Sequence, residues 1–302
     1  MSIISTVIVK SIPFIPKSVV GFFSRPYIAG EALEDGIRVV KDLNAHGIMA
    51  TMDVLGESVN SRAETIEMRN ECADVLHAID REKLDSNLSI KPTQMGLSID
   101  PEFCEENLRY LLDLAKQYGS FVRIDMEDHP FTDATLGMYR RLRREYPGMV
   151  GTVLQAYMRR SATDIAELMG EGPTNLRLCK GIYVEPEQIA YKGREEVREN
   201  FKALNRSLLS NGAYVGIATH DDPLLEHGMA LVRELGLDRS AYEFQMLLGV
   251  RQERRDQIVA QGHRMRVYVP FGSRWYAYST RRLKENPNMA MHIVKAIVGL
   301  NK

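Results

Sequence analysis

Residues 175–221, NLRLCKGIYVEPEQIAYKGREEVRENFKALNRSLLSNGAYVGIATHD, contain one complete unit of the pattern that decides the fold. The unit begins with the short apolar run NLRLCKGIY (175–183), continues with the amphipathic segment EEVRENFKALNRSLLSNG (195–212) and ends with the apolar run AYVGIATHD (213–221). The spacing of the apolar residues changes from about 2 to about 3.6 and back, which predicts a strand, a helix and a strand. Two strands that are joined by a helix in this way pair in parallel.

The same unit recurs along the chain. Amphipathic segments separate short runs rich in β-branched residues, and one of them, CEENLRYLLDLAKQYG (104–119), ends in glycine, as a helix C-terminus prefers. Eight runs are candidate strands: GIMATMDV (47–54), LSIKP (88–92), FVRIDME (121–127), MVGTVLQAY (149–157), NLRLCKGIY (175–183), AYVGIATHD (213–221), YEFQML (242–247) and RMRVYVPFG (264–272). Eight strand–helix repeats predict an α/β fold, a (β/α)8 barrel of the TIM type. A doubly wound open sheet is the alternative, and the sequence lacks the GxGxxG and P-loop motifs that would favour it.

The length of 302 residues suits one barrel domain. Residues 1–45 precede the first candidate strand and have a mostly helical pattern. We therefore expect an N-terminal helical arm over residues 1–45 and the catalytic barrel over residues 46–302. No linker rich in Pro, Gly or Ser divides them, so we expect a single domain overall.

The composition excludes several classes of protein. A formal net charge of −1 gives no general attraction to nucleic acid, and we interpret the basic cluster YRRLRREY (139–146) as a solvated helix face. The cysteines Cys72, Cys104 and Cys179 are odd in number and form no CxxC motif, which indicates a reducing compartment and a cytoplasmic protein. No apolar run is long enough to span a membrane.

The first residues, MSIISTVIVKSIPFIPKSVVGFF (1–23), are apolar but are interrupted by Lys10, Pro13, Pro16 and Lys17. They lack the basic start and the small-residue cleavage site of a secretory signal. We expect this arm to pack on the domain. A peripheral contact with the inner face of the cell membrane is the alternative.

Polar residues lie near the carboxyl ends of the candidate strands, where barrels of this type place their chemistry. These residues are Lys91, Asp125, Glu127, Gln155, Arg177, Lys180, Thr219, His220, Asp221, Glu243, Gln245 and Tyr268. For each one a structural ion pair is an equally good explanation, because buried charges must be paired. A set that is spread over most of the strands favours a binding site, and its basic members indicate an anionic ligand.

The stretch YSTRRLKE (278–285) follows the last candidate strand. In a helix, Tyr278, Arg281, Arg282 and Glu285 would share one face because their spacing is three or four residues. A solvated surface with exposed ion pairs is the simpler interpretation. If the helix crosses the mouth of the barrel, the two arginines would instead bind a carboxylate together with a lysine from a strand end.

Ten short motifs, in order from about residue 28 to the end of the chain, resemble the monofunctional bacterial-type proline dehydrogenases of the proline oxidase family. They are YIAGE (27–31), ATMDVLGE (50–57), SIKPTQMGL (89–97), VRIDMED (122–128), LQAYMRR (154–160), RLCKGIY (177–183), IATHD (217–221), EFQML (243–247), RVYVPFG (266–272) and Tyr278-x-x-Arg281-Arg282-x-x-Glu285. The resemblance implies a distorted (β/α)8 barrel that holds FAD non-covalently, with the last barrel helix over the carboxyl ends of the strands.

The resemblance also implies a reaction. FAD-dependent oxidation of L-proline to Δ1-pyrroline-5-carboxylate, by hydride transfer from proline C5 to flavin N5, would be the first step of proline catabolism. The electrons would pass to a membrane quinone. No aldehyde dehydrogenase domain follows in the sequence, so a separate pyrroline-5-carboxylate dehydrogenase would oxidise the product. The resemblance requires no metal and no nucleic acid.

Site residues are implied where this sequence matches the motifs. Asp125 and Arg177 would be the catalytic residues, with Asp125 orienting the pocket and Arg177 near flavin N5. The substrate would be bound by Lys91, Tyr183, Leu247, Tyr268, Tyr278, Arg281, Arg282 and Glu285. The cofactor would be contacted by Met126, Gln155, Arg177, Lys180, Gly181, Ile182, Thr219 and His220.

Two positions bear on the resemblance. Pro92 stands where the family usually has an aliphatic residue, and because proline removes a ladder donor, the strand should end at Lys91, which leaves the direction of that lysine open. Tyr268 occupies a position that is small in related hydroxyproline enzymes, so its presence favours proline as the substrate.

Three other interpretations remain open. The carboxylates of IDMEDH (124–129) and THDD (219–222) could bind a metal in a lyase or hydrolase barrel. Lys180 could form a Schiff base, as in aldolases. A non-enzymatic scaffold is the third class, and it predicts a protein without a chromophore.

Overall fold

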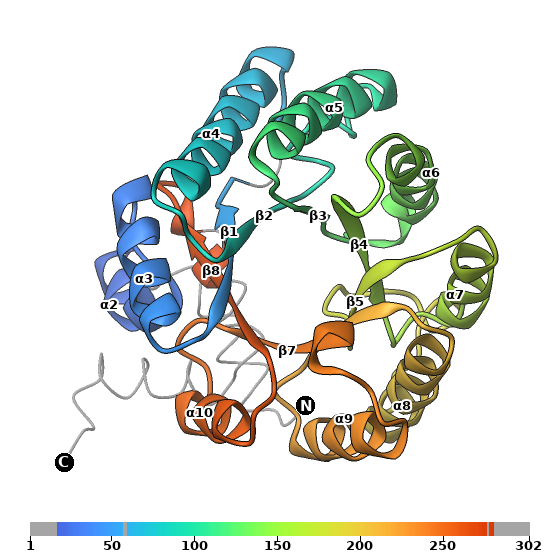
Figure 1. Cartoon of the computed structure of the whole chain (residues 1–302). Helices are drawn as coiled ribbons and strands as arrows, with labels where there is room; N and C mark the ends of the chain where they lie inside the picture. Colours follow the sequence, from blue (N-terminus) through green and yellow to red (C-terminus); the bar gives the residue numbers. More distant parts are fainter. Residues whose placement is uncertain (1–16, 57–58, 277, 281–302) are drawn as a thin grey trace.

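The computed structural model describes residues 17–56, 59–276 and 278–280. Eight parallel strands form a closed barrel in the order of the sequence, and helices surround it (Figure 1). The strands are β1 (Met49–Val54), β2 (Ser86–Ile90), β3 (Val122–Ile124), β4 (Val150–Gln155), β5 (Asn175–Cys179), β6 (Tyr214–Ala218), β7 (Tyr242–Leu247) and β8 (Met265–Phe271). The helices are α2 (Lys17–Ser24), η2 (Arg25–Tyr27), α3 (Leu33–Ala45), α4 (Arg62–Arg81), α5 (Pro101–Tyr118), α6 (His129–Glu145), α7 (Ser161–Gly170), α8 (Arg194–Ser210), α9 (Asp222–Glu234), η3 (Arg239–Ala241) and α10 (Gln252–Ala260).

Each of the eight predicted strands is present. The barrel closes where β8 pairs with β1, from Met49 opposite Arg266 to Val54 opposite Phe271, so the TIM-type barrel is confirmed and the open-sheet alternative is wrong. β2 ends at Ile90, one residue earlier than the sequence suggested.

The two helices that the periodicity marked most clearly are also confirmed. Helix α5 begins after Asp100, whose side chain accepts hydrogen bonds from the backbone of the first turn, and it ends at Gly119 with a φ of 62°. Helix α8 ends at Ser210, and Gly212 takes the left-handed conformation with a φ of 78°. The glycines therefore end these helices as the sequence predicted.

Helix α3 covers the barrel beside β1 and β8. It buries Ile37, Val40 and Leu43 on the face that packs against these strands. The predicted boundary between the arm and the barrel falls at the end of α3 and stays a prediction, and residues 1–16 of the arm lie outside the described residues.

The apolar core lies between the sheet and the surrounding helices. One face of each strand contributes buried aliphatic side chains, as with Met52, Leu88 and Ile217, and the helices contribute residues such as Leu108 and Leu204. This arrangement follows from the two-residue period of a strand, which sends alternate side chains to opposite faces.

The inner face of the barrel is polar. Thr51 of β1 donates a hydrogen bond to the side chain of Asn87 on β2, at 2.5 Å. Arg123 of β3 crosses to the Thr152 carbonyl at 3.0 Å and to the Asn175 side chain at 2.6 Å. Buried polar groups need such partners, so the strands are joined inside the barrel by side-chain hydrogen bonds as well as by the ladder.

Two glycines make room for these side chains. A Cβ on Gly151 of β4 would run into the guanidinium of Arg123. A Cβ on Gly216 of β6 would lie 2.5 Å from Nε2 of Gln245. A larger residue at either position would therefore displace a buried polar side chain from its partners.

A buried ion pair joins β7 to β8. Nε of Arg266 lies 2.8 Å from Oε1 of Glu243, and the hydroxyl of Tyr214 donates to Oε2 at 2.7 Å. Burial by itself would raise the pKa of Glu243, but Arg266 outweighs it and lowers that pKa to about 2.

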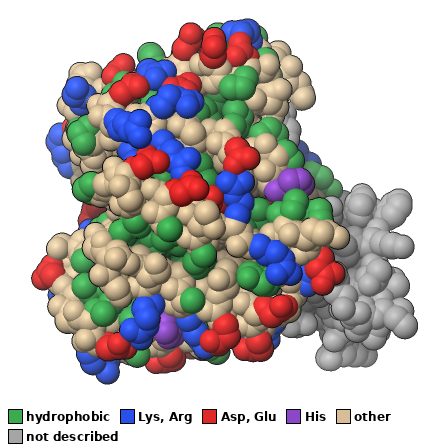
Figure 2. Space-filling view, turned by 90° about the vertical axis from the view of Figure 1, so that its right-hand side faces the viewer, with side chains coloured by type: hydrophobic (Ala, Val, Ile, Leu, Met, Phe, Trp, Pro, Cys, Tyr) green, Lys and Arg blue, Asp and Glu red, His purple; other side chains and the backbone are tan. Residues whose placement is uncertain are grey.

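The outer surface mixes charges of both signs. Figure 2 views the side of the barrel that carries α6 and α7, and acidic and basic side chains are interspersed there. The arginines of the 139–146 cluster pair with neighbouring helices: Arg141 with Glu105 at 2.6 Å and Arg143 with Glu171 at 3.0 Å. Arg141 is exposed, as a solvated helix face requires, whereas Arg143 is buried and also donates to the Leu168 carbonyl, so the interpretation is wrong for that residue. No described helix is long and apolar enough to cross a membrane.

We predict that Arg266→Met lowers the free energy of unfolding at pH 7 by about 3–5 kcal/mol, because it leaves the buried Glu243 carboxylate without its cation. The folded pKa of Glu243 is below its ordinary value of 4.5, so the contribution of the pair is present above pH 4.5 and is lost as the pH falls to about 2. Urea denaturation at several pH values in this range should therefore show that the difference in free energy of unfolding between the wild type and the variant becomes smaller at low pH.

The matched control is Arg206→Met, which removes an arginine from the exposed pair with Glu234. This change should have a far smaller effect on stability. Equal destabilisation by the two substitutions would contradict the prediction.

Candidate active site

A cavity of about 560 Å³ opens at the carboxyl ends of the strands, a size typical of ligand sites. Every described residue that the resemblance assigned to the site lines it: Lys91, Asp125, Met126, Gln155, Arg177, Lys180, Gly181, Ile182, Tyr183, Thr219, His220, Leu247, Tyr268 and Tyr278. Two members of the wider polar set do not line it: Glu127 is bonded to Thr93, and Glu243 is the second residue of β7, away from the carboxyl end of that strand. Arg281, Arg282 and Glu285 lie outside the described residues, and so does most of the predicted last helix.

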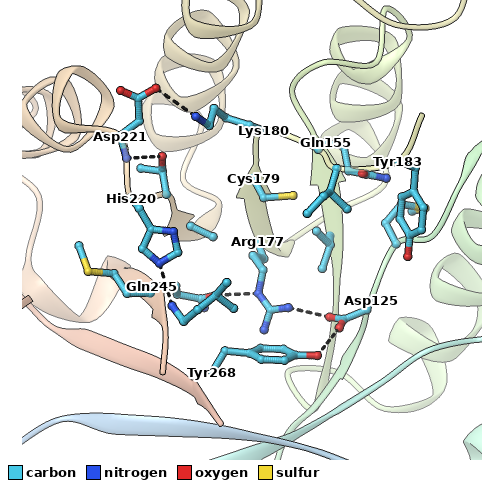
Figure 3. A pocket seen from close by; sticks show the side chains of 18 of the residues that line it. Asp125, Gln155, Arg177, Cys179, Lys180, Tyr183, His220, Asp221, Gln245 and Tyr268 are labelled. Carbon is cyan, nitrogen blue, oxygen red and sulfur yellow. Dashed lines mark hydrogen bonds and ion pairs between the residues drawn. The ribbon is translucent and has the colours of Figure 1, made fainter. Parts of the chain in front are cut away.

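The carboxylate of Asp125 is the centre of a hydrogen-bonded cluster in this cavity (Figure 3). Nη1 of Arg177 lies 2.6 Å from Oδ1, and the hydroxyl of Ser89 donates to the same oxygen at 2.7 Å. The hydroxyl of Tyr268 donates to Oδ2 at 2.8 Å. Burial opposes ionisation, but Arg177 and Lys91 outweigh it and hold the pKa of Asp125 below its ordinary value. Asp125 is therefore a carboxylate at neutral pH.

Arg177 is fixed from two sides. Its Nε donates to Oε1 of Gln245 at 2.6 Å, while its Nη1 contacts Asp125. Gln245 cannot turn over freely, because its Nε2 donates to Glu243 at 2.5 Å. The guanidinium carbon also lies 5.2 Å from the centre of the Tyr268 ring. These contacts aim the guanidinium group before any ligand binds.

Lys91 enters the cavity although β2 ends one residue before it. Its Nζ lies 3.1 Å from Oδ1 of Asp53 and 3.4 Å from the hydroxyl of Tyr268. A longer contact of 3.9 Å reaches Oδ2 of Asp125. The proline at position 92 therefore does not turn the lysine away from the site, which was the point that the sequence left open.

Tyr268 acts as a hydrogen-bond donor in this cluster. Burial raises the pKa of its hydroxyl well above the ordinary value, and the charge of Asp125 raises it further. The hydroxyl consequently keeps its proton at neutral pH and directs it to Asp125.

A second charged group lies at the other end of the cavity. Asp221 is held by Arg198, with Nη2 at 2.8 Å from Oδ1, and by Lys180, with Nζ at 3.1 Å from Oδ2. The hydrogen bond from Arg198 contributes most to lowering the pKa of Asp221 to about 2. The carboxylate stays ionised and orients two cations that line the cavity.

His220 joins two loops at the mouth. Its Nε2 accepts a hydrogen bond from the backbone N–H of Leu247 at 2.9 Å, and its carbonyl accepts one from Arg251 at 2.7 Å. Nε2 of the imidazole therefore carries no proton. The pairing holds the end of β6 against the end of β7.

Sequence reasoning missed three cationic residues that line the cavity, namely Arg194, Arg198 and Arg251. They lie beyond the strands, in the first turns of α8 and just before α10, whereas the sequence pattern marks residues at the strand ends. The signal that was available is the pair of arginines spaced four residues apart at the start of the helix after β5.

The arrangement gives little support to the metal and Schiff-base interpretations. Glu127 accepts hydrogen bonds from the backbone and side chain of Thr93, and Asp221 is occupied by two cations. Among the residues that the structure describes, no three His, Cys, Asp or Glu side chains form a group that could hold a metal ion. Lys180 is 40% exposed and ion-paired, unlike the desolvated amine of a Schiff-base enzyme.

Comparisons with known proteins agree on one family. A family model described as proline dehydrogenase matches residues 37–294. The chain is 40% identical over 275 residues to "Proline dehydrogenase 1" of Bacillus subtilis (strain 168), which covers 91% of this chain and 90% of that protein. It is 37% identical over 276 residues to "Proline dehydrogenase" of Deinococcus radiodurans, with 90% and 89% covered.

A solved structure gives the same answer. The fold matches the crystal structure of proline utilization A (PutA) from Bdellovibrio bacteriovorus inactivated by N-propargylglycine, with a TM-score of 0.84 and 26% identity. The match covers 93% of this chain and 36% of that chain. Because the family model and the relatives span most of its length, the chain belongs to the proline dehydrogenase family.

Proposed function

We propose that this chain oxidises L-proline to Δ1-pyrroline-5-carboxylate, the first step of proline catabolism, with FAD bound non-covalently in the cavity. The observation that carries the proposal is the preorganised Asp125–Arg177–Tyr268–Lys91 cluster at one end of the cavity, opposite a group of arginines at the other. When bound, FAD would supply the electron acceptor for hydride transfer from proline C5 to flavin N5.

The residues of the cavity fit such a cofactor. Val153, Ala218 and Leu247 give it apolar walls that suit a flat ring. Gly181 has a φ of 103°, and a Cβ there would run into the ring of Tyr157, so only glycine permits a close backbone wall. Arg194 and Arg198, in the first two turns of α8, suit a diphosphate, which favours guanidinium groups and helix N-termini.

The roles of the cofactor residues follow from this fit. Lys180 would contact the phosphates at the cationic end, where Asp221 orients it. Arg177 would place its charge beside the reactive part of the ring, where negative charge develops. The remaining cofactor contacts in the proposal are Met126, Gln155, Gly181, Ile182, Thr219 and His220.

A carboxylate clamp would hold the substrate. Lys91 provides one cation from inside the barrel, and Arg281 and Arg282 would provide two more, with Glu285 keeping them in place. The ring of proline would pack against the apolar side chains of the cavity, which are those of Tyr183, Leu247, Tyr268 and Tyr278.

We propose that solvent, and not a side chain, accepts the proton that leaves the substrate amine. Asp125 is a carboxylate that lines the cavity beside Tyr268, but its two oxygens already accept hydrogen bonds from Ser89, Arg177 and Tyr268. A group whose acceptor sites are occupied by a cation and two hydroxyls is a poor general base. Its role is to position Arg177 and Tyr268.

The electrons would leave to a membrane quinone, and the product would pass to a separate pyrroline-5-carboxylate dehydrogenase. An enzyme with these partners would work at the inner face of the membrane, with its N-terminal arm as the candidate contact. These statements rest on the resemblance to the family and complete the proposal.

The test is a visible absorption spectrum of the purified protein, recorded anaerobically before and after L-proline is added. We expect a flavin spectrum that bleaches with L-proline and stays unchanged with D-proline or hydroxyproline. A flavin spectrum indifferent to L-proline would overturn the substrate assignment. A colourless protein that cannot be reconstituted with FAD would overturn the cofactor assignment.

Replacing Arg281 or Arg282 by methionine should raise the KM for proline about 10- to 100-fold, because a charge-assisted hydrogen bond to the carboxylate is lost. FAD should remain bound, since the clamp serves the substrate. Steady-state kinetics and the ratio of flavin to protein measure the two effects. Arg206→Met, on the exposed face of α8, is the control that should leave both unchanged. An unaltered KM in both arginine variants would remove the clamp.

Asp125→Asn should reduce kcat about 10- to 100-fold, because the amide leaves Arg177 without a charged partner to hold it. Ser89→Ala removes a neutral donor from the same carboxylate and should have a clearly smaller effect. Both variants should retain flavin. If the two variants have equal kcat values, the positioning role of the Asp125 charge is wrong.

A further inference from the structure

The segment of residues 180–193, which joins β5 to α8, forms one wall of the cavity. Lys180, Gly181, Ile182 and Tyr183 line it at the start of the segment, and Arg194 lines it directly after the end. The residues between them have no place in the proposed reaction. They raise the question of what holds this long connection in the shape that the cavity needs.

The middle of the segment is anchored by a buried carboxylate. The side chain of Glu185 is 1% exposed, although the residues before and after it in the chain are exposed. Its Oε1 accepts a hydrogen bond from the backbone N–H of His129 at 2.8 Å, and its Oε2 lies 2.5 Å from Nδ1 of the same residue. One carboxylate thus binds one residue twice, at the far side of β4.

The partner residue gives the contact its strength. His129 is the first residue of α6, so its N–H is one of the backbone donors that a helix leaves without a partner inside the helix. A carboxylate at this position also benefits from the positive end of the helix dipole. A buried carboxylate is costly without such compensation. The Glu185 side chain is therefore stable in the buried position only while it contacts the N-terminus of α6.

The anchor also sets which face of the segment is exposed. Residues 182 to 185 alternate, with Ile182 and Val184 exposed and Glu185 buried. Val184 is 99% exposed, which is unusual for an aliphatic side chain. Burial of the valine side chain therefore does not determine the backbone conformation at this point. Glu185 is the buried side chain of this stretch, so its two contacts with His129 determine which way the backbone faces here.

The ends of the segment are held separately. The backbone N–H of Tyr157 donates to the Lys180 carbonyl at 2.8 Å, and the Tyr157 carbonyl accepts from Tyr191 at 2.8 Å. The Tyr157 ring also packs directly under Gly181. The segment is therefore tied to the β4–α7 connection at both ends and to α6 in its middle.

We propose that Glu185 and His129 are a positioning pair that holds the β5–α8 segment in its ligand-ready shape. The pair contacts neither substrate nor cofactor and acts through the wall formed by Gly181, Ile182 and Tyr183. The identity of the ligand rests on the proposed function, whereas the anchoring of the segment does not. Loss of the pair should loosen the wall while the barrel stays folded.

The experiment compares Glu185→Ala, Glu185→Gln and His129→Ala with the control Glu187→Ala. Glu187 is an exposed acid in the same segment, and its side chain has no hydrogen bond or ion pair among the described residues. Hydrogen exchange of residues 181–193 in the protein without added ligand measures the anchor directly. Titration with FAD, followed by flavin fluorescence, measures its effect on binding.

Glu185→Ala should speed exchange in this segment about tenfold or more and weaken FAD binding about 10- to 100-fold, with exchange in the strands unchanged. Glu185→Gln should have a smaller effect, because its amide can accept from the His129 N–H and donate to an unprotonated Nδ1. His129→Ala keeps the backbone donor and should also be intermediate, so it tests the pair even if Glu185→Ala fails to fold.

The two readouts separate the two proposals. Exchange in Glu185→Ala and His129→Ala that matches Glu187→Ala would overturn the positioning pair, whatever the protein binds. Faster exchange with FAD affinity equal to that of the control would overturn the link between the anchor and the cavity wall. Failure of the wild-type protein to bind FAD would overturn the proposed function and leave the exchange result to decide the anchor.

Discussion

The rest of the site depends on the hydrogen bonds and the ion pair that the buried carboxylate of Asp125 makes. This carboxylate lies just after β3 and receives hydrogen bonds from residues on three other strands, namely Ser89 on β2, Arg177 on β5 and Tyr268 on β8. A buried charge is stable only when such partners are in place, so each strand must present its side chain at the correct height. The cluster is therefore ordered by the barrel itself, which is what a site needs if it is to act on a ligand without first rearranging.

The barrel separates its apolar core from its chemistry. Aliphatic side chains fill the layer between the strands and the helices, while hydrogen bonds and ion pairs fill the interior. The interior network runs from Glu243 through Gln245 to Arg177 and Asp125, so the site continues into the lower barrel without a break. Changes at the level of Glu243 can reach the cavity through a short series of fixed contacts.

Much of this could be predicted from the sequence because the information is local. The strands and helices follow from the periodicity of apolar residues, and the cavity residues follow from polar positions at strand ends, so residues such as Gln155 and Lys180 were found. The pairing of Glu185 with His129 could not be predicted in this way, since it joins residues far apart in sequence and depends on how two connections pack.

Other parts of the site escaped prediction for the same reason. Arg198 and Arg251 reach the cavity from a helix and a loop, and their direction is set by ion pairs with acids on neighbouring elements. The direction of Lys91 is set by Asp53, a residue on the adjacent strand that the sequence did not mark as a partner. The proposed clamp at Arg281 and Arg282 lies outside the described residues and stays a prediction.

The closure of the barrel by β1 and β8 has a consequence for how the protein is made. Residues 55–264 separate these two strands in the sequence, yet they share the longest register in the barrel. During synthesis, the free edge of β1 must wait until residues up to Phe271 have left the ribosome before its partner exists. Contacts of such long sequence separation form slowly, and an open strand edge can pair with another chain. The unfinished barrel is thus the form of this protein most prone to aggregation, and the step that removes the danger is the arrival of β8.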